Sequence, residues 1–435
     1  MQKQTRSRVR HRWLLGVMVA IAATTAHAGV VFNVDTTADL VDADTGDGLC
    51  RTSAGNCSLR AAITQSNYLP APFFLSIHVP AGIYVITRPI PPSGFDGEDA
   101  GDFNLRSPPG PNQTVILGAG PALTVIDGNQ LDSILRLDPA RTATIDGVTL
   151  RNGKSIFSGG AIQVEGSLTI SNCVIEDNHA RLEGGAINMG ISSGSSLSVI
   201  GSTLRANVAD NGGGIAAFNN VSIRDSALYG NTAMSNGGGV YNDGQLVVSN
   251  STISGNAANT NGGGIYNRIN ASIYSTSVVN NDADHDRDEN GGIGGGIYND
   301  AGARFVAVNS LFTSNTVLDA PIPNNCNGVL EVYGNNLFDE ISGCTFSGNG
   351  GAAWDFVAGN SVGPLQDNGG PTRTHALLAG STAIDATNAQ GCIDQSGILL
   401  PTDQRGAPRV AGLRCDVGSF EFGAVSDRIF GNGFE

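Results

Sequence analysis

The chain has 435 residues, with 24 basic and 39 acidic side chains and a formal net charge of −15. Five of the basic residues and none of the acidic ones lie in residues 1–28, which leaves 19 basic against 39 acidic residues and one lysine, Lys154, in the remainder. A surface so negative repels phosphate backbones and anionic lipids, which argues against binding to nucleic acid or to a membrane surface.

The first 28 residues have the three parts of an export signal. Basic residues run from Lys3 to Arg12, an apolar stretch covers Leu14–Ala26, and Ala26-His27-Ala28 forms a small-x-small cleavage site. No two arginines are adjacent, so we expect export by the general secretory route and a mature start at Gly29. The alternative is an uncleaved anchor. No later stretch is long and apolar enough to cross a bilayer, so no membrane span is expected after cleavage.

The mature N-terminus predicts one strand and one short helix. Residues Val30–Asp35 have the composition of a strand, and a polar loop with Cys50 and Cys57 follows. Over residues 58–67, Ser58 is a candidate N-cap, and the helical spacing puts several small or apolar side chains on one face. These side chains are Leu59, Ala62, Ile63 and Ser66. Residues 88–112, rich in Pro, Gly and acidic residues, predict a loop, and strands resume at Thr114.

Two phrases repeat in phase through the middle of the chain. A Gly-Gly pair is followed by an aliphatic residue at Ile162, Ile187, Ile215, Val240, Ile265 and Ile297. An apolar-x-x-Asn phrase ends at Asn178, Asn207, Asn231, Asn256, Asn281 and Asn315. Two motifs that share a period of about 25 residues indicate a repeat array.

The residues of each repeat indicate the kind of array. Short runs rich in β-branched residues, such as Leu246–Val248, predict strands. No repeat has apolar residues at the three- and four-residue spacing of an amphipathic helix. About 25 residues suit one coil of three short strands, and stacked coils let the phased Asn amides bond along the axis. We therefore predict a single-stranded parallel β-helix, with the N-terminal helix and disulfide loop covering its open end. The alternative is a disordered Gly/Asn-rich tract.

The seven cysteines fall into three close pairs and one lone residue. The pairs are Cys50/Cys57, Cys326/Cys344 and Cys392/Cys415. In an exported chain such pairs predict disulfides, and neighbour pairing is the simplest of the possible connectivities. Cys173 lies within a predicted strand region, and we expect it to be a buried apolar residue rather than a nucleophile.

Several stretches outside the repeats resemble known families. Gly46–Cys50 and Gly55–Ile63, with the core Cys57-Ser-Leu-Arg-Ala-Ala62, resemble the CSLREA domain, although Ala61 stands where that family has Glu. The resemblance implies an N-terminal cap on an exported right-handed parallel β-helix. The repeats also resemble those of polymorphic outer-membrane proteins, which are β-helix adhesins, although we expect no C-terminal strand barrel of the kind that such proteins carry.

The C-terminal part has resemblances of its own. The ordered series Gly363–His375, Ala376–Asp385, Asp403–Arg409 and Cys415–Glu421 is similar to the choice-of-anchor Q region. The tail Ser426–Glu435 resembles the Ile-Phe-x-x-Gly-Phe-Glu ends of exported proteobacterial proteins. These resemblances imply a sorting tail and an extracellular or cell-surface location on a Gram-negative bacterium.

The chain therefore divides into five parts. We expect a signal peptide at 1–28, a CSLREA-like cap at 29–70 and β-helix repeats at 71–320. An irregular, disulfide-bonded choice-of-anchor Q-like region follows at 321–423, and a tail with a possible sorting role at 424–435.

One interruption in the array carries candidate site residues. The number of residues from a phased Asn to the next Gly-Gly aliphatic residue is about seven larger between Asn281 and Ile297 than elsewhere in the array. This longer interval contains an acidic segment at 282–289. Asp282, Asp284, Asp286 and Asp288 alternate in it, and alternate carboxylates of one loop can converge on calcium. The alternative is a solvated acidic loop, since neither an EF-hand nor an RTX calcium repeat is matched.

Two functions fit this sequence. The first is a secreted or surface-displayed, adhesin-like or structural rod that binds an extracellular polymer, surface or protein without catalysis. The alternative is a polysaccharide lyase or glycoside hydrolase acting on an acidic polysaccharide, by analogy with other β-helix proteins. Its candidate catalytic residues are Asp284, His285, Asp286 and Arg287, with Glu165, Asp177 and Glu183 on other coils.

Overall fold

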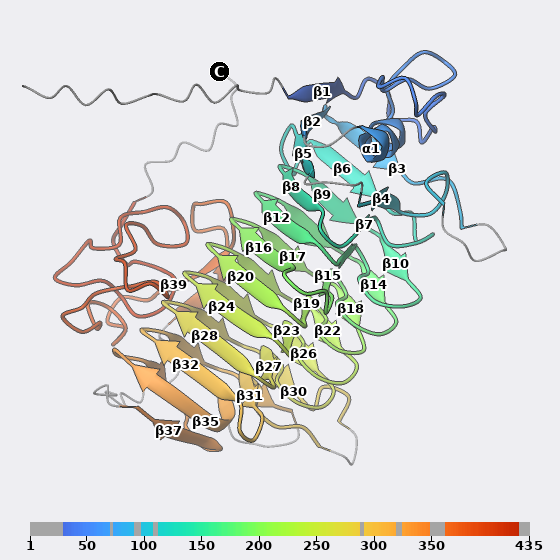
Figure 1. Cartoon of the computed structure of the whole chain (residues 1–435). Coiled ribbons are helices and arrows are strands. Elements are labelled where there is room, and N and C mark those ends of the chain that lie inside the picture. The colour runs from blue at the N-terminus through green and yellow to red at the C-terminus, as the bar shows by residue number, and fades with distance from the viewer. Residues whose placement is uncertain are drawn as a thin grey trace, which may run out of the picture.

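The structure is a computed structural model that describes residues 29–69, 73–90, 97–107, 112–287, 291–318, 324–348 and 362–425. The predicted signal peptide, Asp288 and the tail from residue 426 lie outside these ranges. The chain winds as a parallel β-helix, with the N-terminal helix at one end and the C-terminal region along one side (Figure 1). The predicted fold is therefore confirmed.

The longest strands form sheet 1, which runs the length of the stack. In order along the axis they are β1 (Val30–Asn33), β2 (Phe73–Val79), β5 (Asn112–Gly118), β8 (Thr142–Asp146), β12 (Ser167–Ser171), β16 (Ser196–Ile200), β20 (Asn220–Arg224), β24 (Gln245–Ser249), β28 (Asn270–Tyr274), β32 (Arg304–Val308), β35 (Cys326–Tyr333) and β37 (Cys344–Ser347). At the usual strand spacing this stack is roughly 50 Å long.

Sheet 2 precedes sheet 1 in each coil and sheet 3 follows it. Sheet 2 contains β4 (Phe103–Leu105), β7 (Leu135–Leu137), β11 (Ile162–Val164), β15 (Ile187–Met189), β19 (Ile215–Ala217), β23 (Val240–Asn242), β27 (Ile265–Asn267) and β31 (Ile297–Asn299). Sheet 3 contains β3 (Gly82–Val85), β6 (Thr124–Asp127), β9 (Thr149–Arg151), β13 (Val174–Glu176), β17 (Thr203–Arg205), β21 (Ala227–Tyr229), β25 (Thr252–Ser254), β29 (Ser277–Val279), β33 (Leu311–Thr313) and β36 (Leu337–Phe338).

Each repeat has a fourth strand, where the sequence predicts three. These two-residue strands form sheet 4: β10 (Lys154–Ser155), β14 (His179–Ala180), β18 (Val208–Ala209), β22 (Thr232–Ala233), β26 (Ala257–Ala258), β30 (Asp282–Ala283) and β34 (Thr316–Val317). From β14 onward each begins directly after a phased Asn, because that Asn fixes the backbone of neighbouring coils in register. A two-residue strand shows no alternation, so the sequence pattern could not reveal it.

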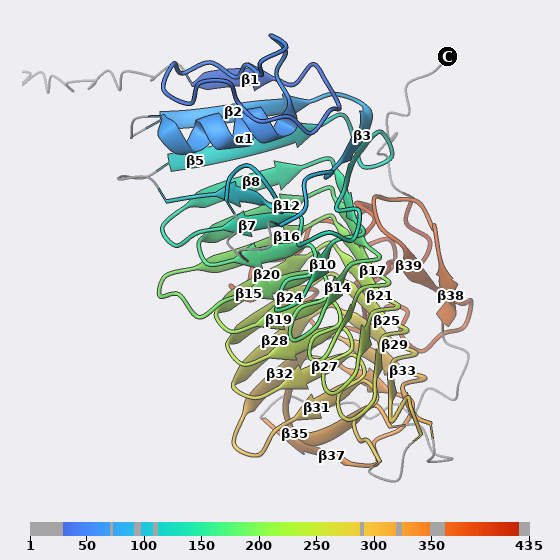
Figure 2. The same ribbon diagram turned by 90° about the vertical axis from the view of Figure 1, so that its right-hand side faces the viewer.

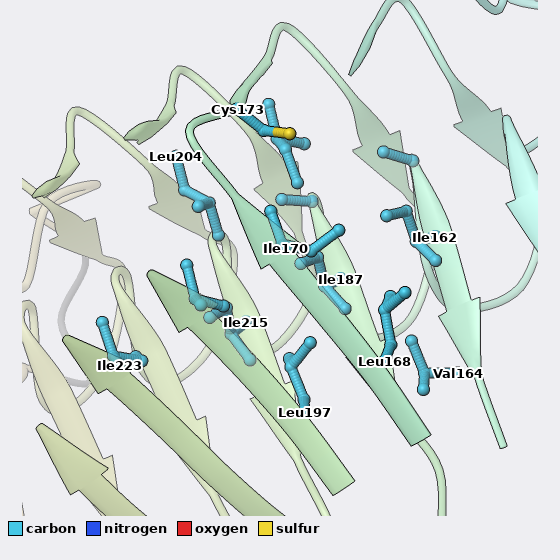
Figure 3. Packing of buried hydrophobic residues seen from close by; sticks show 14 of the residues in the cluster. Ile162, Val164, Leu168, Ile170, Cys173, Ile187, Leu197, Leu204, Ile215 and Ile223 are labelled. Carbon is cyan, nitrogen blue, oxygen red and sulfur yellow. The ribbon is translucent and has the colours of Figure 1, made fainter. Parts of the chain in front are cut away.

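The interior of the coil is filled by the alternating apolar side chains of the strands (Figure 3). In sheet 1, Leu168 and Ile170 are buried, while Thr169 between them faces outward. Ile162, Ile187 and Ile215 of the Gly-Gly phrase stack directly on one another in sheet 2. Cys173 is buried and free, as expected.

The glycines of the Gly-Gly motif are required because the backbone of the next coil passes close to them. A Cβ at Gly238 would lie 2.4 Å from the carbonyl oxygens of both Ala257 and Gly263. Gly237 before it has a φ of +70°, which L side chains rarely adopt. The pair therefore combines a turn with the close approach of the next coil.

The N-terminal cap has the predicted form. Helix α1 (Leu59–Tyr68) packs against β2 and β4, and the Ser58 hydroxyl accepts a hydrogen bond from Ala61 N at 3.0 Å. Arg60 is buried and forms an ion pair with Asp39 at 2.5 Å. None of the helices in the described ranges is long and apolar enough to cross a membrane.

The stack of coils continues past residue 320, the boundary expected from the repeats. Strand β35 pairs with β31 of sheet 2 and β32 of sheet 1, and β37 pairs with β35. The repeat phrase is lost here because one eight-residue strand replaces two shorter ones and their turn. Parallel pairing thus outlasts the periodic sequence and, in the residues that the structure describes, extends to Ser347.

The C-terminal region folds back along sheet 3. It includes the antiparallel pair β38 (Val362–Gln366) and β39 (Thr374–Leu377), which lies beside β21, β25 and β29 (Figure 2). Buried His375 Nε2 lies 2.8 Å from Ser254 Oγ, and Arg409 Nη2 donates to Asn250 Oδ1 at 2.8 Å. All three predicted disulfides are present, which indicates an oxidising compartment: Cys50–Cys57, Cys326–Cys344 and Cys392–Cys415.

Candidate ligand-binding face

The acidic segment after Asn281 is anchored at its start and exposed further on. In β30, Asp282 Oδ1 accepts a hydrogen bond from the Thr316 hydroxyl at 2.8 Å, and its Oδ2 lies 3.2 Å from His285 Nδ1. Asp284 is buried with a φ of +58°, whereas Asp286 is exposed. The alternate carboxylates therefore have different environments within one loop.

The calcium site remains a prediction. Among the side chains that the structure describes, no group of three or more His, Cys, Asp or Glu residues is placed to hold one metal ion. Asp288, the fourth proposed ligand, lies outside those residues. Arg287, the basic residue of the alternative catalytic set, is exposed at a φ of +56°.

The candidate carboxylates on other coils lie at different corners of the helix. Glu165 follows β11, at the turn into sheet 1, and accepts hydrogen bonds from Gln163 and Ser192. Asp177 is in the turn from sheet 3 to sheet 4, and Glu183 is in the loop from sheet 4 to sheet 2. Burial, with the nearby Asp210 carboxylate, raises the pKa of Glu183. The structure does not bring these three carboxylates together.

A more organised surface is the outer side of sheet 2. From β7 to β31, the middle residue of each strand points outward, between two buried residues. In axial order the row is Arg136, Gln163, Asn188, Ala216, Tyr241, Tyr266 and Tyr298. We call this row the sheet 2 face, and its last three members the tyrosine row.

The tyrosine rings are stacked in register with the coils. The ring centroids of Tyr241 and Tyr266 are 5.4 Å apart with an interplanar angle of 6°, and those of Tyr266 and Tyr298 are 4.9 Å apart at 10°. Phe218 extends the series with a tilted ring 6.0 Å from Tyr241. Since parallel strands repeat at nearly the same spacing, the backbone sets this stacking. The result is a row of ring edges and hydroxyl groups along the axis.

Arg268 and two carboxylates border the tyrosine row. Arg268 Nη1 donates to the Tyr241 hydroxyl at 3.2 Å and to Asp243 Oδ2 at 2.8 Å. Arg268 Nε lies 4.0 Å from Asp300 Oδ2. Burial, followed by the Asp300 carboxylate, raises the pKa of Tyr266 to about 12. The Tyr266 hydroxyl therefore stays protonated at neutral pH and can both donate and accept hydrogen bonds.

The tyrosine row was missed in the sequence, although the sequence contains its signal. Val240-Tyr-Asn242, Ile265-Tyr-Asn267 and Ile297-Tyr-Asn299 follow the Gly-Gly runs directly. Because alternate residues of a strand face opposite sides, a Tyr after the core aliphatic must point outward. The same phase that identifies the core thus places the tyrosines on the surface.

The other end of the sheet 2 face opens into a cavity of about 470 Å³. Arg136, Gln163 and Asn188 line it from the sheet. Ile156 and Phe157, in the loop between β10 and β11, line it too and are 63% and 66% exposed. An apolar wall beside convergent polar groups is typical of small-molecule sites.

The described residues of the C-terminal region lie away from this face. Its hydrogen bonds to the coils reach Asn250, Thr252, Ser254 and Ser277, on sheet 3 and the turn before it. In Figure 2 that region lies beside sheet 3, away from the strands of sheet 2. The sheet 2 face therefore combines polar groups, stacked tyrosines and a cavity on one side of the coil.

Comparison of the chain with family models, with curated proteins and with solved structures found no match.

Proposed function

We propose that this chain is an exported β-helix protein that binds an extended neutral polysaccharide along its sheet 2 face without catalysis. The observation that carries the proposal is the alignment of the tyrosine row and the cavity on one face of the coil. Tyrosine provides contact area and a polar tip at low conformational cost, which suits a ligand with both apolar and hydroxyl surfaces.

Charge favours a neutral ligand. The mature sequence has 39 acidic against 19 basic side chains, so a polyanion would approach against long-range repulsion. A neutral polymer meets no such barrier, and the hydroxyls of the tyrosine row and the Arg268 guanidinium can pair with its hydroxyl groups.

We further infer that the chain belongs among the CSLREA proteins that end in a choice-of-anchor Q region. The support is the quoted residues, the capping helix with buried Arg60, and the three disulfides. Such a protein would be displayed on, or released from, a Gram-negative cell. Removal of Ile429–Glu435 tests the sorting role of the tail, and unchanged surface retention would contradict it.

The binding proposal is tested by native electrophoresis of the mature chain through gels that contain glucan, mannan, xylan, alginate or polygalacturonate. We expect retardation by at least one neutral polymer, and a loss of about tenfold in affinity for Tyr266→Ala. Tyr274→Ala on sheet 1 is the matched control, because it removes a half-buried tyrosine from a different face. No retardation by any neutral polymer, or equal loss in both variants, would overturn the proposal.

The same polymers test the catalytic alternative. Incubation with calcium followed by measurement of reducing ends and unsaturated products detects hydrolase and lyase activity. Product release that is abolished by Asp286→Ala would replace the binding role with a catalytic one at the acidic segment.

A further inference from the structure

We infer that the tyrosine row selects an extended β-1,4-linked chain of neutral sugars, with one sugar opposite each coil. This inference rests on the proposed function and narrows its ligand from neutral polysaccharides in general to one linkage class. It follows from the spacing, the straightness and the hydroxyl groups of the row, which lies on the successive strands β23, β27 and β31 (Figure 1).

The spacing of the tyrosines follows the spacing of the coils. The ring centroids of Tyr241, Tyr266 and Tyr298 are 5.4 Å and 4.9 Å apart, close to the usual strand separation of about 4.8 Å. A β-1,4-linked chain of pyranose sugars in its extended ribbon form advances by nearly the same length with each sugar. Successive sugars can therefore stay opposite successive tyrosines.

The side chains of the row also repeat with little rotation from coil to coil. The planes of the Tyr241 and Tyr266 rings differ by 6°, and those of Tyr266 and Tyr298 by 10°. Neighbouring strands of open sheets usually twist by about 20–25°. A ribbon-like polymer can follow such a row over several coils. The chains of α-1,4-linked and β-1,3-linked glucans are helical, so their successive sugars turn away from it.

A row of buried asparagines holds the tyrosines in place. The residues that follow the three tyrosines are Asn242, Asn267 and Asn299, and all are buried. Asn242 Nδ2 donates to Asn267 Oδ1 at 2.6 Å, and Asn267 Nδ2 donates to Asn299 Oδ1 at 2.6 Å. Side-chain ladders of this kind stabilise sheets with little twist. The row is therefore preorganised, which lowers the entropic cost of binding.

The hydroxyl tips of the row are the groups that a polymer meets. Stacking covers both faces of the Tyr266 ring, which leaves its edge and its hydroxyl group toward solvent. The Tyr241 hydroxyl accepts a hydrogen bond from Arg268 Nη1 at 3.2 Å, so its own hydrogen can be donated to a ligand. Both edges of a β-1,4-linked glucan or mannan carry hydroxyl groups. A half-turn between successive sugars therefore still gives each tyrosine a partner.

The charges beside the row favour a neutral chain. Arg268 Nη1 lies 2.8 Å from Asp243 Oδ2, and Arg268 Nε lies 4.0 Å from Asp300 Oδ2. One guanidinium between two carboxylates leaves an excess of negative charge, which disfavours a chain that contains uronates. The hydroxyl groups of a neutral sugar can bond to either kind of group.

The test is isothermal titration of the mature chain with soluble oligosaccharides of defined linkage and length. Cello- and manno-oligosaccharides of two to six sugars supply the β-1,4 linkage, and malto- and laminari-oligosaccharides supply the α-1,4 and β-1,3 linkages. We expect the affinity for at least one β-1,4-linked series to rise about tenfold from the disaccharide to the tetrasaccharide, and then to level off because the row has three tyrosines. At equal length the other two linkages should bind about tenfold more weakly.

Two variants at the centre of the row test the contact itself. Tyr266→Phe keeps the ring in the stack but removes its hydroxyl group, whereas Tyr266→Ala removes both. We expect the affinity for the tetrasaccharide to fall about tenfold in Tyr266→Ala and by a smaller factor in Tyr266→Phe, with an unchanged thermal midpoint in Tyr266→Phe. Tyr274→Ala on sheet 1 is the matched control and should bind as the unaltered chain does. Unaltered affinity in both Tyr266 variants would overturn the inference.

Comparison with the gel assay separates this inference from the proposed function. If a neutral polymer retards the chain but no β-1,4-linked series binds, the linkage is wrong and the binding face stands. The same holds if another linkage binds as tightly, or if affinity does not grow with length. If no neutral polymer retards the chain and no series binds, both proposals fail.

Discussion

The side-chain amide of Asn207 donates a hydrogen bond to Oδ1 of Asn231 in the next coil, with the two atoms 2.9 Å apart. The same Oδ1 accepts the backbone N–H of Asn207, and Asn231 Nδ2 donates to Asn256 Oδ1 and to the Leu204 carbonyl. Asn231 is fully buried, so each of its side-chain polar groups is satisfied without water. The same amide-to-amide hydrogen bond recurs along the row of phased asparagines from Asn178 to Asn315, and it links each coil to the next.

Substitution of Asn231 should destabilise the whole stack. Asn231→Ala removes the acceptor of the Asn207 backbone N–H and of one Asn207 side-chain N–H, and also a donor to the Leu204 carbonyl. Since these groups are buried, we expect a loss of about 2–4 kcal/mol. Denaturant unfolding followed by circular dichroism measures it. Asn220→Ala, an exposed asparagine in the same repeat, should change stability by no more than about 0.5 kcal/mol. Similar losses in both variants would contradict the role of the row.

Two glycines of one repeat, Gly230 and Gly238, should respond differently to alanine. Gly238→Ala places a Cβ 2.4 Å from two carbonyl oxygens of the next coil, so the coils must separate locally. Gly230 has a φ of +63° but nothing within 4 Å of a Cβ, so Gly230→Ala should cost only about 1 kcal/mol of backbone strain. We expect a clearly lower thermal midpoint for Gly238→Ala, and equal midpoints would count against the close coil packing.

The C-terminal region should carry a pH-dependent contribution to stability. Glu421 is buried, and burial raises its pKa from 4.5 to about 7. A carboxyl with a raised folded pKa favours folding while protonated, so its contribution is present below about pH 4.5 and is lost as the pH rises through about 7.

Glu421→Gln tests this contribution, because the neutral amide cannot titrate. Relative to the unaltered chain, the variant should gain stability between about pH 5 and pH 8, whatever its absolute stability. Denaturation midpoints of both proteins across that range give the difference. Parallel pH profiles would show that Glu421 does not titrate in the folded protein within this window.

Cys173 should be chemically inert in the folded protein. It is 2% exposed, and burial raises its pKa to about 12, so almost no thiolate forms at neutral pH. We expect no labelling by iodoacetamide in buffer and one labelled cysteine in denaturant without reductant, measured by mass spectrometry. Rapid labelling of the native protein would contradict both its burial and the role expected from the sequence.

The sequence alone was sufficient for the repeated architecture. The 25-residue phase of Ile187, Asn207 and their equivalents predicts stacked coils, and Ser58 with the helical face after it predicts the cap. These features are local or strictly periodic, so each repeat carries the information for its own fold. The same phase was sufficient to place Tyr241, Tyr266 and Tyr298 outside, although we drew that conclusion only from the structure.

Only the tertiary structure decided where the coils end, how the C-terminal region docks and where a cavity opens. Arg409 meets Asn250 across 159 residues, and no period relates them. The orientation of the Asn188 amide depends on a chain of hydrogen bonds through Gln163 and Glu165, whose direction is set when the coils stack. Such features arise from the relative placement of unlike segments, and a pattern within one segment does not encode them.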